Sequence, residues 1–126
     1  MSYKTDMSRV IGLGSAKDGV EHWWSQRVTA VALVPLAILF IFPLAATIGG
    51  SFEEVRQVYA NPFNAIVAIL FIAVMFRHLS LGLQVVIEDY VHGKTARTTA
   101  LLLNTGFCWL FGLTGVFAVA KIAFAG

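Results

Sequence analysis

The stretch "FNAIVAILFIAVMFRHLSLGLQVVI", residues 63–87, decides the fold class of this chain. It runs for 25 positions in which only Arg77 and His78 are ionisable. Each helical residue rises by about 1.5 Å, so a bilayer core of about 30 Å needs about 20 of them. The stretch is therefore long enough and apolar enough to cross a membrane as a single helix.

The composition supports the same class. The chain has 126 residues, of which 58% are hydrophobic and 13% charged, and its mean hydropathy is +0.78. Soluble domains are usually about 45–50% apolar and about 25% charged. Two further runs, 28–52 and 98–120, contain no charged side chain. We therefore expect an all-α membrane protein with one anchor domain, residues 28–123, built from transmembrane helices at about 28–50, 63–90 and 98–122.

Residues 1–27 are predicted to form a cytoplasmic or interfacial segment before the first helix. They carry seven charged side chains, and the apolar run that follows is longer than the ~7–15 residues of a signal-peptide core. In "EHWWSQR", residues 21–27, the two tryptophans suit the headgroup layer, and Arg27 marks the entrance to the helix. No transit peptide rich in Arg and Ser is recognisable, which favours a multi-pass protein of a bacterial inner membrane over a mitochondrial one.

Lysine and arginine counts predict the orientation. Six of these residues fall on one side of a three-helix topology and two on the other: Lys4, Arg9, Lys17, Arg27, Lys94 and Arg97 against Arg56 and Lys121. The positive-inside rule then places the N-terminus in the cytoplasm and the C-terminus in the periplasm. The net charge of only +2, without a basic run, argues against a nucleic-acid partner.

Other residues predict how the helices bend, begin and pack. Pro35 and Pro43 each remove a backbone donor and should bend the first helix. The segment "EEVRQVY", residues 53–59, is expected to form an interfacial turn of helix, and Pro62 suits the first position of the second span.

The lone Cys108 excludes an internal disulfide and a CxxCH haem-attachment motif. The third span carries three glycines that allow close helix approach: Gly106, Gly112 and Gly115. Such small positions indicate a heteromeric helix bundle with a companion subunit and surrounding lipid.

The central span contains a pair of residues with a regular spacing. At 100° per residue, the eleven positions from His78 to Asp89 make three full turns plus about 20°. The two side chains are therefore expected on nearly the same face, about 16 Å apart along the axis. Leu81, Gly82 and Val85 occupy that face between them.

His78 has two interpretations, because ionisable residues at membrane depth are functional candidates. The simpler one is a hydrogen bond to a neighbouring helix. The other is an axial ligand of haem, for which Gly82 leaves room beside the imidazole and Arg77 offers a cation to an acidic cofactor. A second axial ligand is then expected from a partner, because His22 and His92 lie outside the predicted spans.

Asp89 and Tyr90 also have two interpretations. An interfacial Tyr is ordinary at the end of a transmembrane helix. Acidic residues at that end oppose the helix dipole, however, and a Tyr hydroxyl beside a carboxylate suits a quinone carbonyl and its proton supply. Because the second span runs toward the cytoplasm, both residues are expected at that boundary.

With these residues in place, the chain resembles the hydrophobic membrane-anchor subunits (small cytochrome b, D-type) of succinate dehydrogenase, complex II. The resemblance rests on His78, the ten-residue spacer and the pair Asp89-Tyr90. It is supported by "HWWSQR", residues 22–27, which is similar to the entrance of the family's first helix. It extends over about residues 20–123.

The resemblance implies a membrane anchor of succinate:ubiquinone oxidoreductase that is not catalytic by itself. His78 would be one axial ligand of a haem b shared with the cytochrome b556 anchor subunit, and Arg27 would contact a haem propionate. Tyr90 would hydrogen-bond ubiquinone, the substrate, with support from Asp89. Succinate oxidation would belong to the flavoprotein and iron–sulfur subunits, since this chain has no nucleotide-binding loop and no cysteine cluster.

An unrelated class stays open beside this one. A small membrane subunit or assembly factor of another respiratory or transport complex, without haem, needs only three packed helices. In that protein His78 would serve as an interhelical hydrogen bond.

Overall fold

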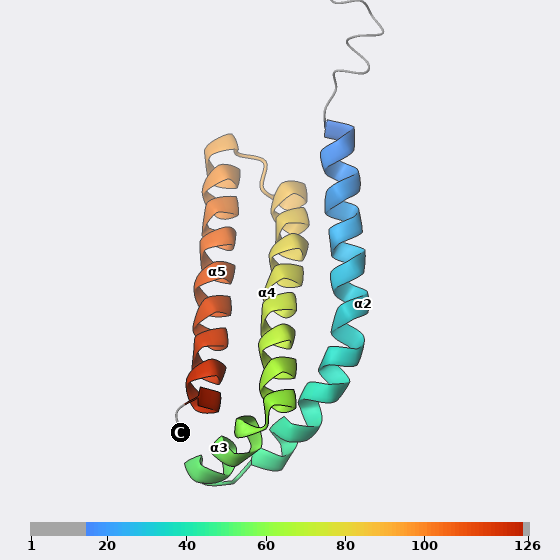
Figure 1. Cartoon of the computed structure of the whole chain (residues 1–126). Coiled ribbons are helices and arrows are strands. Elements are labelled where there is room, and N and C mark those ends of the chain that lie inside the picture. The colour runs from blue at the N-terminus through green and yellow to red at the C-terminus, as the bar shows by residue number, and fades with distance from the viewer. Residues whose placement is uncertain (1–14, 125–126) are drawn as a thin grey trace, which may run out of the picture.

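A computed structural model describes residues 15–124 of the chain (Figure 1). Four helices make up the regular structure of that range: α2 (Ser15–Thr47), α3 (Phe52–Ala60), α4 (Pro62–Tyr90) and α5 (Lys94–Phe124). Three of them, α2, α4 and α5, are long and apolar enough to cross a membrane. The prediction of an all-α membrane protein with three spanning helices is confirmed.

The predicted N-terminal segment is only partly covered by the structure. Lys4 and Arg9, which contribute to the predicted orientation, lie outside the described residues. From Ser15 onward the chain is already helical and continues into the first span without a break. Residues 15–27 are therefore one rod with the helix that follows them, which fixes the side chains of residues 19–27 relative to α4.

The central helix of the bundle is α4, which lies between α2 and α5 (Figure 1). Within the described chain the two outer helices make no contact with each other. Apart from Tyr59 of α3, the buried side chains gather on the inner faces of α4 and α5: Ala65, Val67, Ala68, Leu81, Asn104 and Cys108. No apolar residue of α2 among those described is fully buried, so its wide apolar surface is left for lipid or a partner subunit.

Small residues let α5 approach α4. A methyl group on Gly112 would lie 3.3 Å from Cβ of Phe76, and one on Gly115 would lie 3.1 Å from a methyl carbon of Ile72. The predicted close approach is thus confirmed at these two glycines. A methyl group added to Gly106 would have no atom of a neighbouring described residue within 4 Å. Gly106 lies on the face of α5 that points away from α4.

A polar contact also joins these two helices. The side-chain amide of Asn104 donates to the backbone carbonyl of Ser80 at 2.9 Å, and the Cys108 thiol donates to the Asn104 amide oxygen at 3.6 Å. Hydrogen bonds between membrane helices contribute on the order of 0.6 kcal/mol each. Their main effect is to fix the axial register of α5 against α4.

The two prolines of the first span lie inside α2. Figure 1 shows that α2 curves over the half that carries them, toward α3. The predicted bend is present, and it brings the end of α2 beneath the other helices. There α3 contacts all three spanning helices.

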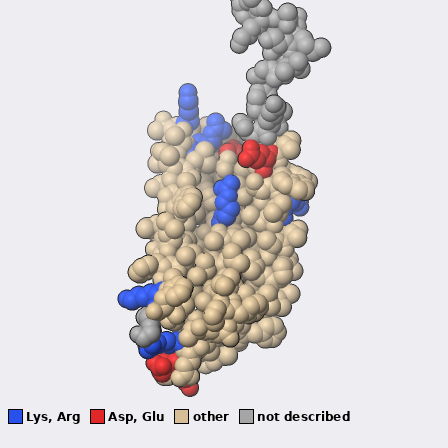
Figure 2. Space-filling view, in the orientation of Figure 1, with Lys and Arg blue, Asp and Glu red and all other residues tan. Residues whose placement is uncertain are grey.

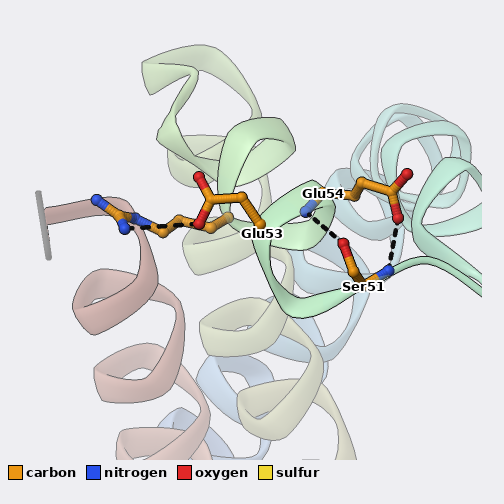
Figure 3. Close-up of polar contacts among 4 residues, drawn as sticks. Ser51, Glu53 and Glu54 are labelled. Carbon is orange, nitrogen blue, oxygen red and sulfur yellow. Dashed lines mark hydrogen bonds and ion pairs between the residues drawn. The ribbon is translucent and has the colours of Figure 1, made fainter.

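The short helix α3 confirms the predicted turn of helix over residues 53–59. It begins with a capping box, in which the Ser51 hydroxyl accepts from the Glu54 amide and the Glu54 carboxylate accepts from the Ser51 amide (Figure 3). The hydrogen bond from the Ser51 backbone amide lowers the pKa of the Glu54 carboxyl, with a further contribution from the Ser51 side chain. A salt bridge of 3.7 Å joins Arg56 to Glu53 one turn away. At the other end of α3, burial raises the pKa of the Tyr59 phenol.

The charged side chains follow the long axis of the bundle. On the face drawn in Figure 2, acidic side chains gather at the two ends, and the surface between them is mostly uncharged. This is the distribution expected of a bundle whose middle contacts hydrocarbon.

Candidate functional site

The imidazole of His78 contacts α2. Its Nδ1 lies 2.9 Å from the hydroxyl oxygen of Thr29, and that hydroxyl donates to the Ser25 carbonyl at 2.8 Å. A hydroxyl has a single hydrogen, so when Thr29 donates to Ser25 it accepts the hydrogen of His78 Nδ1. This tautomer leaves a lone pair on His78 Nε2, which is the form in which an imidazole binds a metal.

His78 borders a cavity of about 330 Å³ between α2 and α4. The cavity is lined from α2 by His22, Trp23, Gln26, Arg27 and Ala30, and from α4 by His78 and Val85. The guanidinium of Arg27 lies over the Trp23 ring, 5.3 Å from its centroid, a distance typical of a cation–π contact. The cavity therefore combines an imidazole, a cation and apolar walls.

Two sequence-predicted residues, His78 and Arg27, meet in this cavity. Val85 joins them, as the periodicity predicted for the face of α4 that carries His78. Gly82 belongs to the same face, but the Gln26 side chain lies against it, 3.5 Å from where a methyl group would be. The room that the sequence predicts beside Gly82 is thus filled by α2, because α2 packs closely there.

Arg77 has a different neighbourhood. It lines a second cavity of about 250 Å³, between α4 and α5, together with Ser80, Cys108 and Trp109. Adjacent helical residues are rotated by 100°, so Arg77 points away from the α2 side on which His78 lies. The expectation that Arg77 serves the ligand of His78 is not supported by this geometry.

Sequence reasoning missed His22, Gln26 and Thr29. The sequence places His22 before the first predicted span, whereas in the structure it lies within α2 and lines the same cavity as His78. The missed signal is the spacing of His22, Gln26 and Thr29, which places all three on one side of α2. His22 nevertheless lies seven residues before Thr29, about 10 Å along the axis, and is too far from His78 to ligate the same iron.

Asp89 and Tyr90 end α4 at the surface of the bundle. Tyr90 is 77% exposed, Asp89 is exposed, and neither lines the cavity of His78. The neighbouring Glu88 accepts a hydrogen bond of 2.9 Å from the Gln84 amide. Asp89 and Tyr90 are therefore open to a ligand or to another subunit, and a site built on them is incomplete in this chain alone.

Residues 15–124 contain no cluster of three or more His, Cys, Asp or Glu side chains that is able to hold a bare metal ion. A single imidazole with a free Nε2 suits an iron that is already held by a macrocycle. The donor set around His78 therefore fits a haem and does not fit a free metal ion.

The fold and this cavity define a three-span helical membrane protein that places two histidines and one arginine between two of its helices. A model of the family "Succinate dehydrogenase/Fumarate reductase transmembrane subunit" matches residues 1–117. The chain belongs to this family, as a membrane-anchor subunit of succinate dehydrogenase.

Curated relatives agree with the family. The chain is 36% identical over 122 residues to the "Succinate dehydrogenase hydrophobic membrane anchor subunit" of Paracoccus denitrificans, covering 97% of this chain and 94% of the relative. It is 28% identical to the subunit of that name in Rickettsia typhi, covering 86% of each. It is 32% identical to the "Succinate dehydrogenase membrane anchor subunit" of Reclinomonas americana, covering 69% of this chain and 75% of the relative. No solved structure gives a significant match.

The spans and the relatives together give the location. Three helices of the described chain are able to cross a membrane, and the matching subunits include those of the bacteria Paracoccus and Rickettsia. The chain is a multi-pass protein of the bacterial inner membrane.

Proposed function

We propose that this chain anchors the flavoprotein and iron–sulfur subunits of a succinate:ubiquinone oxidoreductase and supplies one axial ligand of a haem b. His78 is the ligand, through Nε2, and the cytochrome b556 anchor subunit supplies the other. The chain oxidises nothing by itself. A haem held by His78 would supply one-electron redox chemistry.

The observation that carries the proposal is the hydrogen bond between Thr29 and Nδ1 of His78. Metal-ligating histidines almost always donate their second ring N–H to a neighbouring oxygen, which fixes the tautomer and the ring orientation. Arg27 lines the same cavity and is placed to neutralise a haem propionate. Nδ1 is thus engaged and Nε2 is available, as a haem ligand requires.

Tyr90 and Asp89 form part of the ubiquinone site in this proposal. Their exposure at the end of α4 leaves the Tyr90 hydroxyl free to donate to a quinone carbonyl, while the Asp89 carboxylate supports that group and its proton supply. The positive-inside rule places this end of α4 on the cytoplasmic side. The soluble subunits dock there, and the rest of the site comes from them and from the second anchor.

A haem-free anchor is the second candidate. The hydrogen bond between His78 and Thr29 also serves a purely structural histidine that joins α2 to α4. The presence of Arg27 in the same cavity favours the haem-binding form, because a structural histidine has no need of a cation beside it.

The decisive experiment is purification of the complex in mild detergent through a tag on this chain. Flavoprotein and iron–sulfur subunits are expected to co-purify, with a b-type spectrum on reduction. His78→Ala should abolish or shift that spectrum. His92→Ala is the matched control, because His92 is exposed beyond the end of α4. A spectrum unchanged in His78→Ala would refute the haem assignment, and failure of the two subunits to co-purify would refute the anchor function.

A further inference from the structure

Two buried polar atoms of α2 have no hydrogen-bond partner among the described residues. They are Nε2 of His22 and Oε1 of Gln26. These residues are one helical turn apart, so their side chains lie on the same side of α2, and both line the cavity of His78. Buried polar groups are nearly always hydrogen-bonded. Two such groups at one cavity indicate a bound partner that this part of the chain does not supply.

The charge of the cavity indicates what that partner is. Arg27 contributes a cation, and none of the lining residues is acidic. Nε2 of His22 donates when it carries the ring hydrogen, and the Gln26 amide presents its NH₂ group after a half-turn of its last torsion. Two donors beside a guanidinium suit a carboxylate, because hydrogen bonds to an ionised acceptor are the strong ones.

The positions along α2 indicate which carboxylate. Gln26 and His22 precede Thr29 by three and seven residues, which are rises of about 5 Å and about 10 Å. Both therefore lie toward the N-terminal end of α2 from His78, which bonds to Thr29. A haem carries its two carboxylates on one edge of the ring, displaced from the iron.

We infer that His22 and Gln26 hydrogen-bond a haem carboxylate, next to the contact made by Arg27. The inference rests on the proposed function and deepens it, because it assigns the carboxylate edge of the haem to three residues of α2. Arg27 is the one cation among the described residues that line the cavity. His22 and Gln26 add two neutral donors beside it, and the haem in turn satisfies their buried atoms.

The test compares haem with its dimethyl ester, in which both carboxylates are blocked. The whole complex is prepared from haem-deficient cells and titrated with each compound, and binding is followed by absorbance. His22→Leu and Gln26→Leu should each weaken haem binding by about tenfold or more, the effect of one hydrogen bond to a charged group. The ester should show a much smaller loss in both variants.

Two further variants sharpen the comparison. His22→Gln keeps an N–H donor at a similar reach and should bind haem like the wild type. Glu21→Gln changes the exposed neighbour of His22, which does not line the cavity, and should have no effect. Subunit co-purification, measured on the same samples, reports whether each variant assembles.

The outcomes separate this inference from the proposed function. Equal losses for haem and its ester would overturn the inference and indicate instead that His22 and Gln26 bond to the partner subunit. Unchanged haem binding in both leucine variants would also overturn it. A wild-type complex that binds neither compound would refute the proposed haem site itself.

Discussion

Replacement of Thr29 by valine tests whether the hydrogen bond to His78 supports a metal ligand. Valine has nearly the same shape as threonine and is also β-branched, so the change removes the hydroxyl and little else. The lost contact is a single bond of 2.9 Å to Nδ1 of His78. The other contacts of the Thr29 hydroxyl are to backbone carbonyls of α2, at 2.8 and 3.1 Å, and those carbonyls already belong to the helix.

The size of the effect follows from two ranges. A typical intramolecular hydrogen bond contributes about 0.5–1.5 kcal/mol. Loss of the partner that orients a metal-ligating histidine lowers metal affinity by about 10–100-fold. Because Thr29 is a neutral hydroxyl, we expect the lower end, about tenfold, which corresponds to about 1.4 kcal/mol. This value agrees with the upper end of the range for one hydrogen bond.

The assay is titration of the haem-free complex with haem, read at the absorbance of the bound form. Thr29→Ser keeps the hydroxyl and should bind haem nearly as well as the wild type. Thr114→Val is the matched control, because Thr114 makes the same kind of bond to a backbone carbonyl, Leu110, on the exposed side of α5. The reasoning is refuted if Thr29→Val and Thr114→Val have equal effects, or if Thr29→Ser loses as much affinity as Thr29→Val.

Three other changes test the quinone contact, the helix packing and the capping box. Tyr90→Phe should slow quinone reduction while electron transfer from succinate to a water-soluble dye persists, and equal losses in both assays would indicate an assembly defect instead. Gly112→Val should destabilise the packing of α4 and α5 by about 1–3 kcal/mol, the cost of overpacking, because the new side chain meets Phe76. Thermal unfolding in detergent measures this, and Gly106→Val, in open space, should have a much smaller effect. The pKa of Glu54 is lowered by its bonds to Ser51, so this carboxylate stabilises α3 above the ordinary glutamate pKa of about 4.3 and loses that effect as the pH falls through its lowered pKa. Hydrogen exchange of the α3 amides, corrected for intrinsic rates, should show protection falling over that pH range in the wild type and not in Glu54→Gln, and equal pH profiles would contradict the assignment.

The fold class was predictable because membrane insertion depends on local composition. A run of about 20 apolar residues crosses a bilayer whatever its neighbours are, so three such runs predict three spans, and the structure has them. Caps and kinks are equally local. Pro62 at the start of α4 and the two prolines inside α2 act through their own backbone geometry.

The face that carries His78 was predictable only in part. Helical periodicity places His78, Gly82 and Val85 on one side of α4, and all three face α2 in the structure. Periodicity does not give the axial offset between two helices. That offset decides that Thr29 contacts His78, that Gln26 fills the space beside Gly82, and that His22 reaches the same cavity.

The spans, the bends, the turn between α2 and α4, and the candidate residues of α4 are all predictable from the sequence, because each depends on residues close together in the chain. The surroundings of these residues depend on the tertiary structure. It directed Arg77 to the cavity between α4 and α5 and Arg27 to that of His78, and it left two polar atoms of α2 buried without a partner in the described chain. The physical reason is that helix packing is set by the fit of whole surfaces, such as the seat of Phe76 on Gly112, and that fit fixes the register between segments distant in sequence.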